Sequence, residues 1–109
     1  MWIFLNDAFL SIVADRKSNQ LLVRARLPGD IEQMFPGVEI AEDAGTDYRF
    51  RTWLDREAVA KALSDKVEDI NYGNFKGSVQ DHARHHAYFG VWEVMNRAQK
   101  EARRRVRGG

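Results

Sequence analysis

Two apolar runs open the chain and predict a β-hairpin. Residues 2–5 and 9–13 are apolar at almost every position, and the polar pair Asn6-Asp7 lies between them. Asn and Asp tolerate the backbone angles of a tight two-residue turn, so the two runs are expected to pair as antiparallel strands. Because neighbouring residues in both runs are apolar, we expect both strands to be covered on each face.

Two later segments alternate between apolar and polar residues, which is typical of half-exposed strands. The first, residues 21–26, places Arg24 and Arg26 on its polar face. The second, residues 47–54, is expected to pair with residues 38–41 around an acidic loop. Its alternation predicts Tyr48, Phe50 and Thr52 toward the core, and Arg49, Arg51 and Trp53 away from it.

Helical spacing predicts one short helix and two long ones. Asp30 is expected to cap the short helix, which ends before Pro36-Gly37. Asp55 is expected to cap a helix over residues 55–70 that carries one apolar stripe. A capping box of Ser78 and Asp81 is expected to open the longest helix, residues 79–104, which has a broad apolar face.

These elements predict an α+β fold. We expect an antiparallel sheet of about five strands, with the two long helices packed on one face and one short helix between strands. A chain of 109 residues removes roughly 65% of its unfolded surface from water, which one core can achieve. We therefore expect a single domain over residues 1–102, followed by a basic C-terminal tail over residues 103–109.

Composition narrows the setting of the protein. Apolar residues make up 44% of the chain, there is no Cys, and no apolar run is long enough to span a bilayer. We expect a cytoplasmic protein that has no membrane partner. The net charge of +1 hides a split, because residues 1–81 carry ten basic and fourteen acidic side chains, whereas residues 82–109 carry seven and two.

No complete reaction apparatus is recognisable, so we expect no enzymatic activity, catalytic residue, cofactor or metal. The strongest contrary signal is the histidine cluster, where His82 and His86 lie four residues apart and one metal could bind both. Glu93 lies about 10 Å further along the same helix and cannot complete that site. Asp81 and His85 form a rival pair on another line of the helix.

Three surfaces are candidates for binding a partner. Arginines on the outward sheet face suit phosphates, unless cross-strand acids such as Glu39 neutralise them. Aromatic side chains are also expected on exposed surfaces, and the end of the chain is strongly basic. The candidate residues are Arg24, Arg26, Arg49, Arg51, Trp53, Phe89 and Trp92, with Arg103, Arg104, Arg105 and Arg107 in the tail.

Six stretches of the sequence carry a resemblance: residues 1–13 (MWIFLNDAFLSIV), 23–26 (VRAR), 29–32 (GDIE), 47–51 (DYRFR), 74–79 (NFKGSV) and 81–92 (DHARHHAYFGVW). Together they are similar to a family of short, uncharacterised bacterial proteins. The resemblance covers residues 1 to about 98 and implies no activity, cofactor or site.

The sequence therefore favours a small, non-enzymatic protein-interaction protein whose partner is unidentified. The alternative is a nucleic-acid-binding protein that uses the arginine-rich sheet face and the basic tail. A third hypothesis, a metal-dependent enzyme built on the histidines, ranks below both. We also expect the last helix to overhang the sheet and to pair with a second copy, antiparallel, so that its arginines lie near Glu93 and Glu101 of the partner.

Overall fold

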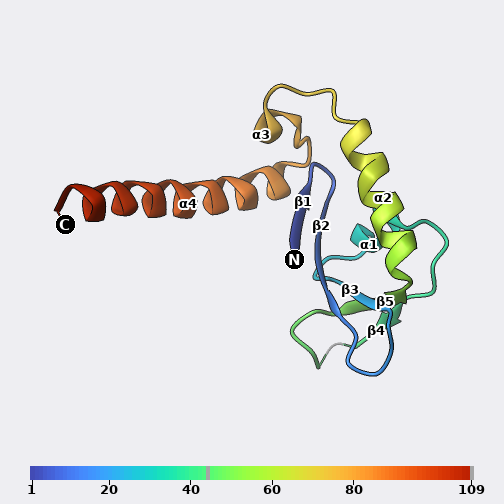
Figure 1. The fold of residues 1–109 in the computed structure, drawn as a ribbon. Coiled ribbons are helices and arrows are strands. Elements are labelled where there is room, and N and C mark those ends of the chain that lie inside the picture. The colour runs from blue at the N-terminus through green and yellow to red at the C-terminus, as the bar shows by residue number, and fades with distance from the viewer. Residues whose placement is uncertain (44, 109) are drawn as a thin grey trace. The chain divides into compact units, whose positions relative to one another are not determined.

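The computed structural model describes residues 1–43 and 45–108, and they divide into two compact units, Met1–Tyr72 and Gly73–Gly109. The predicted α+β class and antiparallel sheet are confirmed (Figure 1). The boundary between the two compact units lies at residue 72. The last helix continues without a break to Gly108, through residues 103–108 of the expected tail.

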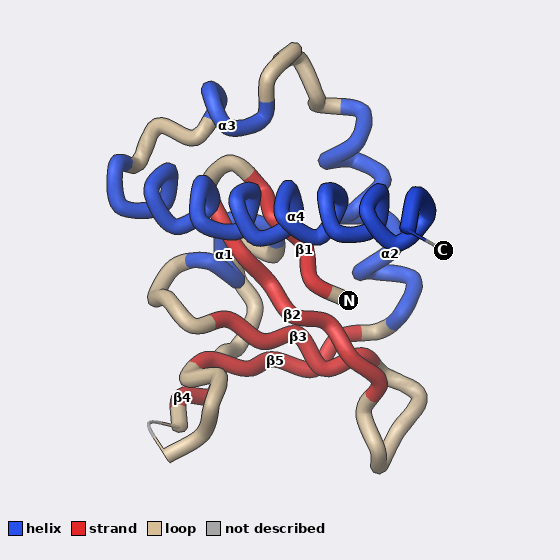
Figure 2. The backbone as a smooth tube through the Cα atoms, turned by 90° about the vertical axis from the view of Figure 1, so that its left-hand side faces the viewer, coloured by secondary structure: helices blue, strands red, loops and turns tan. Residues whose placement is uncertain are grey.

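The first unit contains a sheet that has five strands within the described residues, in the order β1-β2-β3-β5-β4. The strands are β1 (Trp2–Leu5), β2 (Ala8–Ala14), β3 (Leu21–Ala25), β4 (Ala41–Glu42) and β5 (Phe50–Leu54). All neighbouring pairs are antiparallel. Figure 2 shows the long β2 and β3 strands in the middle of the sheet and the short β4 strand at its edge.

The predicted N-terminal hairpin is confirmed, because Leu5 pairs with Ala8 across the Asn6-Asp7 turn. The expectation that both strands are covered on each face is wrong for β1. This strand lies at the edge of the sheet, and Trp2 is 65% exposed. The apolar side chains of β1 instead extend two surfaces: Ile3 and Leu5 pack against the core, while Trp2 and Phe4 contact Phe9 on the opposite face.

Two helices cover one face of the sheet and form the core with it. They are α1 (Asp30–Met34) and α2 (Arg56–Glu68). Leu10 and Val23 of the sheet are fully buried in one cluster with Ile31 of α1 and Val59 of α2. The predicted stripe of the second helix is buried only in its first half, since Val67 and Ile70 are exposed.

The N-terminus of α1 differs from the predicted cap. Gly29 occupies the cap position with a φ of 88°, a conformation that glycine adopts without strain. Asp30 is the first helical residue, and its Oδ2 accepts the backbone N–H of Phe9 at 3.0 Å. The carboxylate therefore joins the helix to β2 instead of capping the helix.

The second unit contains α3 (Phe75–Ser78) and α4 (His82–Gly108). The predicted capping box is wrong, because Ser78 ends a separate short helix. The backbone N–H of Arg84 donates to Asp81 Oδ2 at 2.8 Å, so Asp81 alone caps α4. Phe75 lies in α3 and stacks on the Tyr88 ring of α4 at 5.8 Å.

The apolar stripe of α4 is largely exposed. Tyr88 is buried, but Val91, Val94 and Met95 are 41%, 53% and 64% exposed. The exposed part of the stripe therefore begins one turn beyond Tyr88 and continues toward the end of the helix.

Candidate binding surfaces

Strand register places a row of polar side chains on the sheet face opposite the core. Ser11 of β2 pairs with Arg24 of β3, and Arg24 pairs with Arg51 of β5. The neighbouring row, Ile12, Val23 and Thr52, is buried on the core face. Because directly opposed residues share a face and successive residues alternate, Arg24 and Arg51 lie side by side on the outer face.

The Arg24 guanidinium is held in place by two groups of the first unit. Its Nη2 donates to the buried Ser11 hydroxyl at 2.8 Å, and its Cζ lies 4.4 Å from the centre of the Tyr48 ring. Tyr48 was expected on the core face, and that expectation is wrong. The residue precedes β5, so the strand alternation does not extend to it, and its ring is buried beneath Arg24 and Arg26.

Two of the four predicted arginines are neutralised by acids, as the cross-strand alternative required. Arg26 Nη1 lies 3.0 Å from Asp47 Oδ1, and Arg49 Nη2 lies 2.6 Å from Glu42 Oε1. The acids differ from the one expected, since the Glu39 carbonyl oxygen accepts the Thr52 hydroxyl instead. Hydrogen bonding to Arg26 lowers the pKa of Asp47, which keeps this carboxylate charged.

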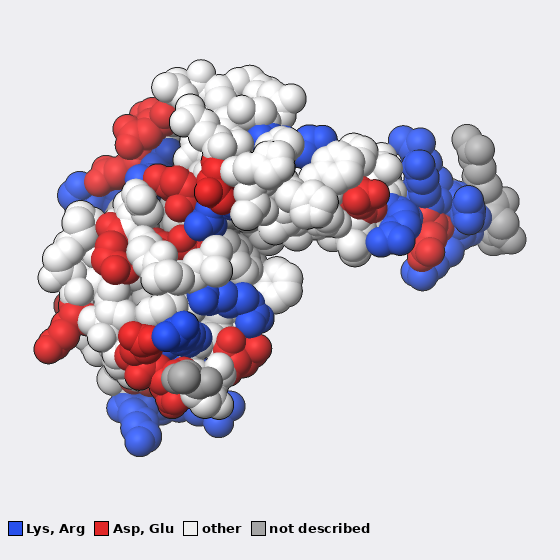
Figure 3. Space-filling model, turned by 180° about the vertical axis from the view of Figure 1, so that it is seen from behind, with Lys and Arg blue, Asp and Glu red and all other residues white. Residues whose placement is uncertain are grey.

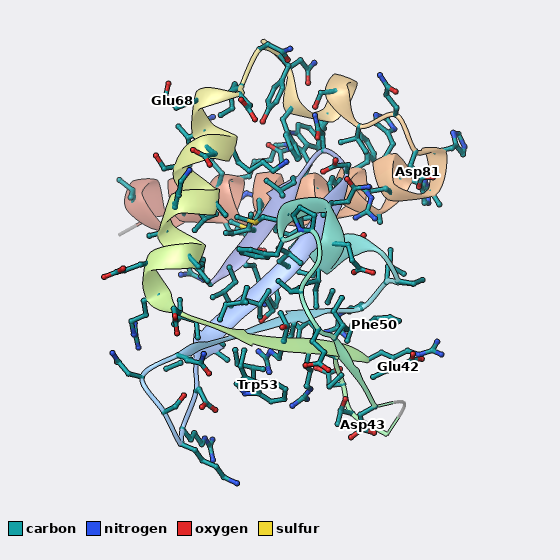
Figure 4. The ribbon with its side chains drawn as sticks, turned by 90° about the vertical axis from the view of Figure 1, so that its right-hand side faces the viewer. Glu42, Asp43, Phe50, Trp53, Glu68 and Asp81 are labelled. Atoms are coloured by element: carbon teal, nitrogen blue, oxygen red, sulfur yellow. The ribbon has the colours of Figure 1, made fainter. Side chains whose placement is uncertain are left out.

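The other two arginines line a groove of about 710 Å³. No described carboxylate lies within 4 Å of a charged nitrogen of Arg24 or Arg51. Leu22 and Val13 supply apolar lining, and Trp53 forms part of the wall. Figure 4 shows Trp53 at this part of the sheet.

The groove brings in two cations that the sequence reasoning did not select. Arg16 and Lys17 lie in the connection between β2 and β3 and line the groove together with the sheet arginines. Their proximity follows from the hairpin register, which returns the chain beside β2 at residue 21. The available signal was a basic pair in the connection between two predicted strands.

The connection also contributes one acid, Asp15. The Ser18 hydroxyl donates to Asp15 Oδ2 at 2.6 Å, and this hydrogen bond is the largest cause of the lowered pKa of Asp15. The backbone N–H of Gln20 donates in turn to the Ser18 oxygen. The carboxylate thus orders the turn that carries Arg16 and Lys17, and the groove retains an excess of positive charge.

Aromatic side chains extend the outer face beyond the groove. Trp2 pairs with Ser11 and therefore belongs to the same cross-strand row as Arg24 and Arg51. Its ring meets Phe9 edge-on at 5.9 Å, and Phe9 stacks on Phe4 at 4.6 Å. The outer face therefore carries arginines with an exposed indole on either side.

In the second unit, the predicted residues Phe89 and Trp92 form one stacked pair on α4. Their ring centres are 5.7 Å apart, and the ammonium of Lys76 from α3 lies 4.1 Å from the centre of the Trp92 ring. Trp92 also borders a shallow groove of about 510 Å³ that includes Met95 and Ala98. The aromatic pair therefore adjoins the exposed apolar stripe.

The C-terminal arginines continue α4 as a regular helix. Arg103, Arg104 and Arg105 are exposed, and Figure 3 shows basic side chains gathered near this end of the helix. The side chain of Arg107 lies outside the described part of the chain.

The histidines lie in the first turns of α4, where His82 and His86 are exposed. Among the described residues, no group of three or more His, Cys, Asp or Glu side chains is arranged to hold a metal ion. Within the same part of the chain, no helix combines the length and the apolar character needed to cross a membrane.

Comparison with known proteins adds no relative: no family model, curated protein or solved structure matches the chain.

Proposed function

We propose that the chain is a non-enzymatic interaction protein that self-associates through α4, which pairs with the α4 helix of a second copy in antiparallel orientation. The observation that carries this proposal is the exposed apolar stripe on a 27-residue helix. Contiguous exposed apolar surface is a mark of an interaction site.

The spacing of the stripe suits a two-helix contact. Tyr88, Val91, Met95, Ala98 and Ala102 follow one another at intervals of three, four, three and four residues. Apolar residues that alternate at these intervals define the seam of a helix pair. The seam thus supports a helix, and not a sheet or a loop, as the occupant.

The sizes of these side chains favour the antiparallel orientation. In the register that centres the pair between residues 96 and 97, Met95 lies opposite Ala98 of the partner, and Val91 lies opposite Ala102. Each layer then combines a larger and a smaller side chain, so the two helix axes keep a nearly constant separation. A parallel pair would place Met95 against Met95 and Ala102 against Ala102, which leaves uneven layers.

Charge favours the same orientation. In the antiparallel register, Arg104 of one copy lies at the level of residue 89 of the other, so the two Arg103–Arg105 clusters are about 22 Å apart along the axis. This separation exceeds the Debye length of about 8 Å at physiological ionic strength. A parallel pair would bring six arginines together.

The expected contact between Glu93 and the arginines of the second copy does not fit this register. Glu93 lies about 160° around the helix from Val91 at 100° per residue, on the far side from the stripe. It therefore does not face the partner's arginines. The antiparallel orientation is favoured instead because it separates the two Arg103–Arg105 clusters and so reduces their repulsion.

Cysteine cross-linking tests both association and orientation, because the natural chain has no Cys. A disulfide requires Cα atoms within about 7 Å. We expect V91C protein mixed with A102C protein to cross-link under mild oxidation. A102C protein alone should stay uncross-linked, because in the antiparallel register its two copies are eleven residues, about 16 Å, apart.

Sedimentation equilibrium over a range of concentrations supplies the second measurement. Met95→Glu places a charge in the seam and should shift the protein to monomer, while Asn96→Glu, which adds the same charge off the stripe, should leave the dimer intact. A natural chain that stays monomeric at all concentrations refutes the proposal, as does efficient cross-linking of A102C alone.

A further inference from the structure

We infer that the outer face of the first unit's sheet is a binding site for single-stranded nucleic acid, with the groove formed by Arg16, Lys17, Arg24, Arg51 and Trp53 as its centre. This inference concerns Met1–Tyr72 and is independent of the pairing of α4.

Positive charge is concentrated in the groove, although the first unit as a whole carries more acidic than basic side chains. Residues 1–72 carry nine basic and thirteen acidic side chains, yet the groove is lined by four cations and one carboxylate, Asp15. The other two predicted arginines, Arg26 and Arg49, are held by Asp47 and Glu42. The anion-binding capacity of the face is therefore local and lies at the groove.

The geometry of Arg24 and Arg51 suits phosphate oxygens. Arg24 is anchored by Ser11 and by the Tyr48 ring, and Arg51 Nε donates to the Tyr48 carbonyl oxygen at 3.4 Å. Arg24 and Arg51 are paired on adjacent strands, whose backbones lie about 5 Å apart. Arginine presents several N–H donors in one plane and binds phosphate with two parallel hydrogen bonds, so a pre-oriented pair loses little side-chain entropy on binding.

The exposed indoles distinguish a nucleic acid from an acidic peptide. Trp53 is 42% exposed at the groove, and Trp2 is 65% exposed at the other end of the Ser11, Arg24 and Arg51 row. Three strand spacings separate β1 from β5, or about 14 Å. Bases stack on such rings regardless of sequence, while phosphates contact cations between them. A carboxylate-rich peptide would use the cations and leave both indoles without a role.

The predicted ligand is a single strand rather than a duplex. The sheet face offers ring surfaces for unstacked bases, and a duplex keeps its bases stacked on one another. Only four cations face the ligand, so the binding should depend moderately on salt. For contacts to at most four phosphates of a single strand, log K should fall with log salt with a slope of roughly −2 to −3.

The experiment uses the full chain and a fluorescein-labelled oligothymidylate of about twelve nucleotides, a length within the range that sheet-based single-strand sites cover. Fluorescence anisotropy measures affinity at several salt concentrations. The double variant Arg16→Gln/Lys17→Gln should weaken binding about tenfold at low salt and make the salt slope shallower by about 1.4. The matched control Lys61→Gln/Lys66→Gln removes two cations from α2, which packs on the opposite sheet face, and should bind as the natural chain does.

The indole is tested separately by Trp53→Leu, with Trp92→Leu as the matched control in the second unit. We expect Trp53→Leu to weaken binding about tenfold with little change in salt slope, because stacking is not ionic. These groove side chains are exposed and the variants should fold, which circular dichroism verifies. As a second measurement, the indole N–H resonance of Trp53 should shift on titration with the oligonucleotide, while that of Trp92 should not.

Four results would overturn the inference: no binding at low salt, equal loss in the two double variants, duplex DNA of the same length binding at least as tightly, or polyglutamate of similar length displacing the oligonucleotide at equal concentration. The last result would assign the groove to acidic proteins. The variant Met95→Glu should retain full oligonucleotide binding in the monomer, so failure of the proposed self-association and failure of this inference are distinguishable.

Discussion

Replacing Leu10 with Ala should destabilise the first unit strongly. Leu10 is a fully buried residue of β2, and it lies in the cluster that joins the sheet to α1 and α2. Its directly opposed neighbour on β1 is Ile3, which also packs on this core. Truncation therefore removes apolar contacts within this cluster and with an adjacent strand.

The expected magnitude follows from how far the site can relax. A buried Leu→Ala change costs about 2–5 kcal/mol, and the cost is larger where the surroundings cannot collapse into the cavity. Strands pair on both sides of β2, which restricts such collapse, so we expect about 3–4 kcal/mol. Small domains are stable by roughly 5–15 kcal/mol in total, so this is a large fraction of the margin.

Urea unfolding provides the assay. Trp92→Phe removes the indole of the second unit, so in this background the fluorescence reports Trp2 and Trp53 of the first unit. With a slope of about 1–3 kcal/mol per molar urea, Leu10→Ala should lower the midpoint by roughly 1–4 M. Leu27→Ala is the matched control, because Leu27 is 51% exposed and its truncation should shift the midpoint by much less.

Equal shifts in the two leucine variants would refute the assignment of the core. A cost below about 1 kcal/mol for Leu10→Ala would do so as well, since it would place the side chain in water.

Three further predictions concern local structure. Gly29→Ala should destabilise the first unit by about 1–2 kcal/mol in urea unfolding, because Gly29 has a φ of 88°. By contrast, Gly90→Ala within α4 should raise the helicity measured by circular dichroism, because Gly costs about 1 kcal/mol in a helix interior and no neighbour lies within 4 Å of the added Cβ. Asp81→Ala should destabilise α4 by about 0.5–2 kcal/mol and increase hydrogen exchange at the Arg84 amide, while Ser78→Ala should not affect that amide. Arg26 lowers the folded-state pKa of Asp47, so the small stabilising effect of this ion pair is present above the unfolded pKa of about 3.9 and is lost as pH falls through the folded pKa. In the Arg26→Gln variant, carboxyl NMR should show the pKa of Asp47 rising toward its ordinary value. An unchanged pKa would contradict the ion pair.

The sequence was most informative where a side chain's role depends on its near neighbours. The turn at Asn6-Asp7, the alternation through Val23 and the buried start of the second helix at Val59 were all predictable, because local spacing determines which residues share a face. Alternation failed at Tyr48, since it holds only while the chain remains paired, and the pattern itself does not encode the residue at which pairing begins. The Asp30 cap failed for a similar reason: its carboxylate is used by the Phe9 amide, a partner 21 residues away.

The candidate sites were less predictable because they depend on pairing between distant segments. Four outward arginines look equivalent in the sequence, yet register gives Arg26 and Arg49 acidic partners and leaves Arg24 beside Arg51. Only the return of the chain after the β2–β3 turn adds Arg16 and Lys17 to this pair.

The apolar stripe of α4 marks a more general limit of sequence patterns. A helix that packs on its own sheet and a helix that pairs with another molecule have the same periodic spacing, because both bury one face. The size order along the stripe carries additional information. Val91 and Met95 precede Ala98 and Ala102, so the large and small halves complement each other when one copy is reversed. Packing against a sheet does not require large and small side chains to complement each other in this way. This complementarity and the exposure of the stripe together favour a second copy of the chain as the partner of α4.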